Sequence, residues 1–169
     1  MQTTVYSAEE EQLLMSRLWS PALKDDPLRF VLYVFPWGQP GTPLEHFQGP
    51  RRWQREVLQQ LADHIRQNNG KIDFDTFRMA VSSGRGIGKS ALVSWLVIWM
   101  LGTRIGSTTI VSANSEAQLR SVTWAEITKW LSMSLNSHWF EVSATRVMPA
   151  KWLTELVERD LKMGTRYWG

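Results

Sequence analysis

The chain has 169 residues, 19 Lys and Arg against 16 Asp and Glu, and an apolar fraction of 43%. This length fits one globular domain, and the composition is too apolar for general disorder. The lack of cysteine excludes disulfide frameworks and thiolate metal sites, and a net charge of +3 does not by itself indicate a nucleic-acid partner.

The predicted elements of the first half are helices joined by a long loop. Residues 7–19 carry apolar side chains behind an acidic first turn, which is typical of an amphipathic helix. The apolar run 30–35 leads into a segment rich in Pro and Gly, which must be irregular loop. A periodic apolar pattern then predicts a helix over 53–65. Because the loop is the one plausible boundary, we expect a lead-in over 1–48 and the main domain over 49–169.

Strands and helices alternate in the second half. Residues 77–81 alternate apolar and polar side chains, and 108–113 is rich in β-branched residues, so both are predicted strands. Alternation of strand and helix predicts an α/β fold with a parallel sheet and crossover helices. The other predicted elements are helices over 88–101, from Ser115 and over 149–161, and a short strand or irregular segment over 138–147.

A glycine-rich loop, SGRGIGKS over 83–90, lies between the first predicted strand and the next helix. Its glycines let the backbone wrap closely round a polyphosphate, and the helix presents its positive end to the anion. Lys89 would reach the β- and γ-phosphates, and the Ser90 hydroxyl would bind Mg²⁺. The sequence therefore predicts an ATP and Mg²⁺ site, formed by Gly84, Arg85, Gly86, Ile87, Gly88, Lys89 and Ser90.

The loop departs from the standard phosphate-binding pattern at Ser83, where that pattern has glycine. The alternative interpretation is a glycine-rich turn with an incidental lysine. The glycine spacing does not match the dinucleotide fingerprint, which disfavours a Rossmann oxidoreductase. Hydrolysis also needs an acidic pair after a hydrophobic strand. No downstream acid meets that pattern, and Glu141, the nearest, is better explained as solvent-facing.

Four segments in order resemble the N-terminal ATPase region of tailed-phage terminase large subunits, the motors that package viral DNA. They are PWG at 36–38, GPRRWQRE at 49–56, SSGRGIGKS at 82–90 and VSANSEAQ at 111–118. The resemblance implies a P-loop NTPase fold of the helicase and terminase type, a parallel sheet with flanking helices. We expect it to be incomplete at its C-terminus, because the family's Asp-Glu strand and nuclease domain do not follow.

The resemblance also implies roles for individual residues. Trp53-Gln54 resembles the adenine-recognising motif, which would place the Gln54 amide on the base edge. Arg85 resembles the basic residue ahead of the lysine and would contact phosphate or sense the γ-phosphate, so Lys89 and Arg85 are the candidate catalytic residues. An exposed glutamine and a solvated arginine are the plainer alternatives. Asn114 and Ser115 are weak phosphate-binding candidates that an ordinary helix N-cap explains equally well.

The function implied is an ATP-binding fragment of a DNA-packaging motor that hydrolyses ATP slowly or not at all. In the intact protein the implied partners are double-stranded DNA, the terminase small subunit and the portal. A helicase-like ATPase and a non-catalytic nucleotide-binding module remain open alternatives. No secretory signal or membrane span is apparent, so we expect the host cytoplasm and a phage or prophage origin.

Other unusual residues are explained as structure. The tryptophans of the predicted helices, Trp95, Trp99, Trp124 and Trp130, are expected in the core. The histidines lack the spacing of a metal site, and the cluster Arg51, Arg52 and Arg55 is expected to be a solvated face. Asp73 and Asp75 flank one residue of an extended segment and have no third ligand in reach.

Overall fold

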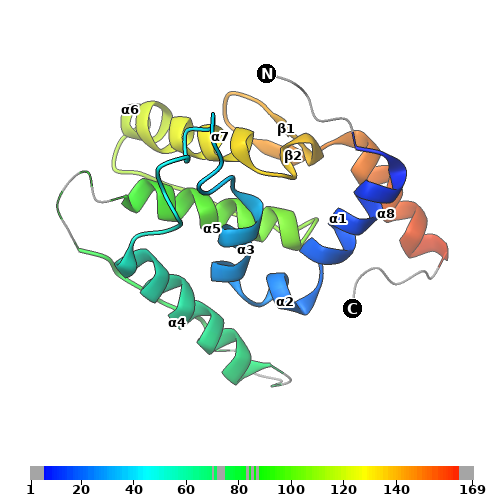
Figure 1. Cartoon of the computed structure of the whole chain (residues 1–169), viewed down its shortest axis with the longest axis horizontal. Coiled ribbons are helices and arrows are strands. Elements are labelled where there is room, and N and C mark those ends of the chain that lie inside the picture. Colours follow the sequence, from blue (N-terminus) through cyan, green and yellow to red (C-terminus); the bar gives the residue numbers. More distant parts are fainter. Residues whose placement is uncertain are drawn as a thin grey trace.

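A computed structural model describes residues 6–69, 71, 75–82, 84, 86 and 88–163. The chain is mostly helical, with a two-stranded antiparallel sheet at one edge beside α7 (Figure 1). The elements are α1 Ala8–Leu18, α2 Pro21–Lys24, α3 Pro27–Val34, α4 Arg52–Asn68, α5 Lys89–Thr103, α6 Glu116–Gln118, the π-helical η1 Leu119–Trp124, α7 Ala125–Met133, the 3₁₀-helical η2 Ser137–Trp139, β1 Phe140–Val142, β2 Val147–Pro149 and α8 Lys151–Met163.

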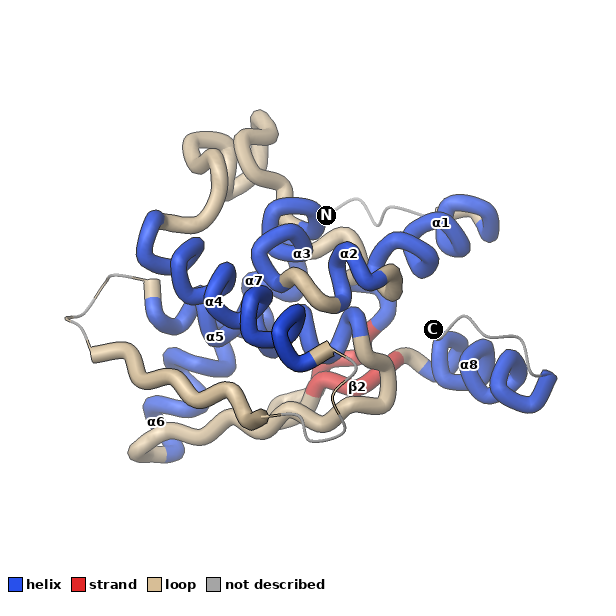
Figure 2. The backbone as a smooth tube through the Cα atoms, turned by 90° about the horizontal axis from the view of Figure 1, so that it is seen from below, coloured by secondary structure: helices blue, strands red, loops and turns tan. Residues whose placement is uncertain are grey.

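The predicted parallel sheet with flanking helices is wrong. The sheet that the structure contains is the hairpin β1–β2, in which Phe140 pairs with Pro149 and Val142 with Val147. Residues 75–82 and 107–113 are drawn as loop in Figure 2. Neither segment pairs with a strand in the described part of the chain, and Ile110 remains 88% exposed. Alternating apolar and polar side chains predict an extended backbone. A strand also needs a neighbouring strand that forms hydrogen bonds with its main-chain N–H and C=O groups.

The predicted helices are present because their local signals agree with their packing. The Ser7 hydroxyl accepts a hydrogen bond from Glu10 N–H, and the Glu10 carboxylate accepts one from Ser7 N–H, so α1 begins with a capping box. α3 is a helix where the sequence suggested only an apolar run. Asp26 caps it by accepting from Arg29 N–H, and Pro27 occupies its first turn.

The core forms around α5, which is apolar on every side and therefore needs neighbours all round. Figure 1 shows α5 between α4 and α7, with α3 beside it. The lead-in 1–48 supplies part of the same core through Leu18, Phe30 and Val31, each with no exposed surface. The prediction of buried tryptophans holds for Trp95, Trp99 and Trp130, while Trp124 is half-buried.

Gly102 lies in the last turn of α5, where its missing side chain makes room for Asn136. A Cβ at this position would lie 2.7 Å from Asn136 Nδ2 and 3.6 Å from Phe30 Cζ. Glycine-to-alanine changes within helices usually stabilise by about 1 kcal/mol. We expect Gly102→Ala instead to lower the free energy of unfolding by about 1–3 kcal/mol, because overpacking outweighs helix propensity. Urea unfolding of the two proteins measures this, and a stabilised variant would contradict the packing at Asn136.

No described helix is long and apolar enough to cross a membrane.

Candidate functional site

The N-terminus of α5 is half-buried and has no side-chain cap. Gly86 and Gly88 both have positive φ angles, 75° and 92°, and Gly88 is the N-cap residue. Such angles suit glycine and strain other residues. Gly88, the N-cap residue, has no side chain that could accept from the N–H groups of the first turn. These groups carry the positive end of the helix dipole, so they can receive an anion.

Two side chains from the start of α4 hold the loop in place. Gln54 is 3% exposed, and its Nε2 donates to the Gly88 carbonyl at 2.9 Å while its Oε1 accepts from Arg51 N–H at 2.8 Å. The Arg51 guanidinium donates to the Gly86 carbonyl at 3.3 Å. Because these loop carbonyls are bonded toward α4, they are held away from an anion bound at the N–H groups. We refer to these three hydrogen bonds as the loop clamp.

An apolar pocket of about 240 Å³ adjoins the same loop. Gly86 and Gly88 form one side, and the other walls come from the 37–49 loop, α5 and α7. Arg51 and Lys129 also border it, and both side chains are exposed. The aromatic residues that line it are Trp37, Phe47, Trp95 and Trp130, and we call it the aromatic pocket.

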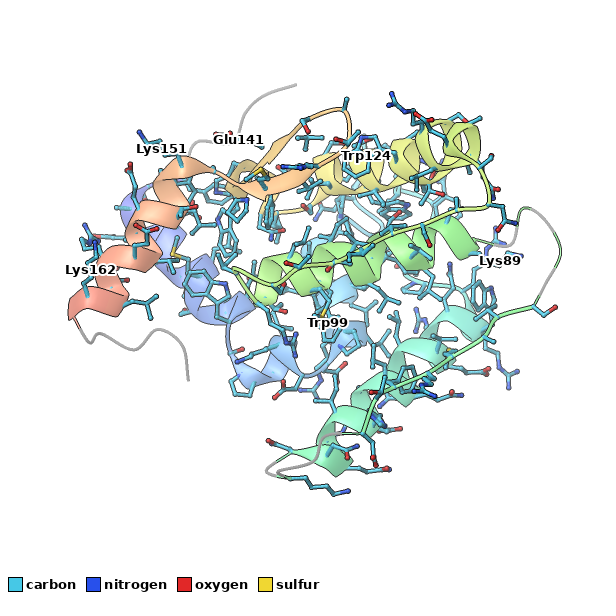
Figure 3. All side chains as sticks on the ribbon, turned by 180° about the vertical axis from the view of Figure 1, so that it is seen from behind. Lys89, Trp99, Trp124, Glu141, Lys151 and Lys162 are labelled. Atoms are coloured by element: carbon cyan, nitrogen blue, oxygen red, sulfur yellow. The ribbon has the colours of Figure 1, made fainter. Side chains whose placement is uncertain are left out.

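Lys89 borders a different space from the aromatic pocket. With Trp53, it lines a groove of about 430 Å³ between α4, residues 77–81 and α5. Figure 3 shows Lys89 at the end of α5 that faces the start of α4. The two spaces therefore lie on different sides of the same helix end. Phosphate at the N–H groups of α5 would lie between them, and the flexible Lys89 stem would have to turn toward it.

The structure brings some predicted site residues together and places others elsewhere. Gly86, Gly88, Lys89 and Ser90 gather at the start of α5, close to Gln54. A Cβ added to Gly84 would have no neighbouring atom within 4 Å. The predicted residues Arg85 and Ile87 lie outside the described residues, as does Asp73.

The weaker candidates have structural roles or none at this site. The Ser115 hydroxyl accepts a hydrogen bond from Gln118 N–H and so caps α6, as the N-cap alternative proposed. Glu141 is exposed on β1 and lies away from Lys89, in the half of the molecule that contains α8 (Figure 3). His138 has an acidic partner that its place in the sequence does not indicate, because its Nε2 lies 2.7 Å from Glu11 Oε2. No cluster of three metal-ligating side chains occurs among the residues that the structure covers.

Sequence reasoning missed the aromatic pocket and the loop clamp. Trp37 belongs to the PWG segment at 36–38, and Trp95 and Trp130 are predicted core residues. Nothing in their spacing along the chain indicates that they meet at the glycine-rich loop. Arg51 and Gln54 stand three residues apart at the start of a predicted helix, and that capping-box spacing was a usable signal for the hydrogen bond between them.

No family model, curated protein or solved structure matches the chain.

Proposed function

We propose that this chain binds ATP, with the polyphosphate at the N-terminus of α5. The observation that carries the proposal is the uncapped start of this 15-residue helix, entered through two glycines of positive φ and followed by Lys89 and Ser90. Backbone N–H groups and the helix dipole favour a phosphate there. Lys89 then supplies a point charge, and Ser90 supplies a hydroxyl as a ligand for Mg²⁺.

The surroundings of the loop favour an anion. Arg51, Lys89 and Lys129 are positively charged and border the two spaces at the end of α5. No Asp or Glu lines either space within the described residues. Hydrolysis requires a group that orients the attacking water. The proposal therefore concerns ATP binding. Lys89 and Arg85 are candidates for contacts with the phosphates, and no residue is assigned to orient the attacking water.

The biological role that we propose is the ATP-binding part of a phage DNA-packaging motor. Support comes from the order of the four segments that resemble terminase large subunits, among them the glycine-rich loop and the Trp53-Gln54 pair. Double-stranded DNA, the small subunit and the portal would be partners of the intact protein. The parallel sheet of that family is not part of the proposal. A nucleotide-binding module without motor activity would use the same loop.

Titration of a fluorescent ATP analogue in the presence of Mg²⁺ tests the site. We expect Lys89→Ala to weaken binding about 10- to 100-fold, because a hydrogen bond to a charged group contributes roughly 1.5–3 kcal/mol. Lys151→Ala is the matched control, since Lys151 is exposed on α8 at the other end of the molecule (Figure 3). Equal affinity of the Lys89→Ala variant and the unaltered chain would remove the phosphate assignment.

A further inference from the structure

A second groove, separate from the glycine-rich loop, lies between the hairpin β1–β2 and the extended segment 107–113. Its volume is about 650 Å³. In Figure 3 the segment crosses in front of α5, and the hairpin lies on the same side of the molecule. The helices α5, η1 and α7 supply the apolar lining, which consists of Val97, Leu101, Leu119, Trp124 and Ile127. We call this space the hairpin groove.

The wall formed by β2 has main-chain groups that its own hairpin does not use. Ser143 N–H donates to the Arg146 carbonyl, and Ala150 N–H donates to the Trp139 carbonyl, both at 2.8 Å. Bonded and non-bonded pairs alternate along an antiparallel ladder. Val147 follows Arg146 directly, so its N–H and C=O point away from β1. No described residue bonds to these two groups.

The opposite wall of the hairpin groove is an extended chain without any ladder. Residues 108–113 form no main-chain hydrogen bond in the part of the chain that the structure describes. Thr109 and Val111 are half-buried, whereas Thr108 and Ile110 are exposed, so the side chains alternate as they do in a strand. β-branched residues favour that conformation. A chain of this kind is a template for pairing with another strand.

The main-chain groups of both walls select a polypeptide as the occupant. Only another extended backbone repeats donors and acceptors at the spacing of a strand. The charges at the border indicate which peptide fits. Glu116 is paired with Arg120 at 2.9 Å, whereas the Arg146 guanidinium forms no ion pair with any described residue. The unbalanced positive charge of Arg146 favours a carboxylate on the partner.

We propose that the hairpin groove binds an extended, acidic peptide segment of a partner protein. The segment adds a strand between β2 and 107–113, and its carboxylate lies beside Arg146. Alternate apolar side chains of the peptide contact the lining from α5 and η1, while the others face solvent. The proposal is independent of ATP binding, because no residue of the glycine-rich loop borders this groove.

Fluorescence anisotropy of the full chain with a labelled synthetic peptide, Asp-Val-Thr-Val-Thr-Val-Asp, tests the proposal. Its valines share one face of a strand, and an aspartate meets Arg146 in either strand direction. A second peptide carries N-methyl groups on both threonines, which removes donors along one edge and keeps every side chain. We expect it to bind about 5- to 100-fold more weakly. Amide exchange of residues 108–113 should slow at least about tenfold when the unmethylated peptide is bound.

Arg146→Glu should weaken the unmethylated peptide about 3- to 10-fold at low salt. Lys162→Glu is the matched control, because it makes the same charge change at an exposed position of α8 outside the groove (Figure 3). Failure of the unmethylated peptide to bind overturns the proposal, as does equal binding of both peptides or unchanged exchange at 108–113. Equal effects of the two charge changes overturn the role of Arg146. A dimer of the chain that the peptide dissociates, seen by sedimentation, identifies a second copy as the occupant and overturns the partner peptide.

Discussion

Gln54→Leu is expected to lower the free energy of unfolding by about 2–5 kcal/mol in the absence of any nucleotide. The side chain is 3% exposed, and its amide serves both the Gly88 carbonyl and Arg51 N–H. Leucine has a similar volume but leaves the Arg51 group and one position on the Gly88 carbonyl without partners. Each unsatisfied buried group costs roughly 1–3 kcal/mol. Urea unfolding followed by circular dichroism measures the loss.

The same variant distinguishes two roles of Gln54: holding the glycine-rich loop through the loop clamp, and recognising the adenine base. A clamp predicts lost stability without ligand, together with weaker binding of ATP and of tripolyphosphate alike. If Gln54 instead recognises adenine, the variant should have near-normal stability and should lose binding of ATP only. Gln60→Leu is the control, because Gln60 is exposed on the same helix. Gln54→Glu adds a further check: its carboxylate can still accept from Arg51 N–H but cannot donate to Gly88, so it should weaken both ligands.

Glu11→Ala is expected to lower the free energy of unfolding by about 1–3 kcal/mol, since it leaves a buried donor without its acceptor. Trp139 has no exposed surface, and its indole N–H donates to the Glu11 carboxylate. The second carboxylate oxygen lies 2.7 Å from His138 Nε2. These contacts join α1 to the segment 137–139, which is more than a hundred residues away in the sequence. Chemical denaturation is again the measurement.

Glu9→Ala is the matched control for this cluster, because Glu9 is exposed in the first turn of the same helix. His138→Phe separates the two partners of Glu11. It removes the ring nitrogens but keeps an aromatic ring beside Tyr6, whose centroid lies 4.8 Å from that of His138. We expect its effect to be smaller than that of Glu11→Ala, because Trp139 remains paired. An unaltered unfolding midpoint in Glu11→Ala would show that the carboxylate does not hold α1 in place.

Local signals predicted most helices of this protein. The periodic apolar pattern of 53–65 lies within α4, and the apolar run 88–101 agrees with α5 to within a few residues. A helix satisfies its own main-chain hydrogen bonds, so its pattern is sufficient to locate it. The apolar run 30–35 alone does not predict α3, because the residues that begin this helix are Asp26 and Pro27, which precede the run.

The sequence by itself determined most of the helices, the glycine-rich loop at the start of α5 and the apolar character of the core. Tertiary structure alone decided the rest. Segments 75–82 and 107–113 pair with no strand among the residues that the structure describes, so they form no parallel sheet there, because strand pairing depends on distant main-chain groups. The aromatic pocket and the partners of Gln54 likewise depend on residues far apart in the chain, whose meeting no local spacing encodes.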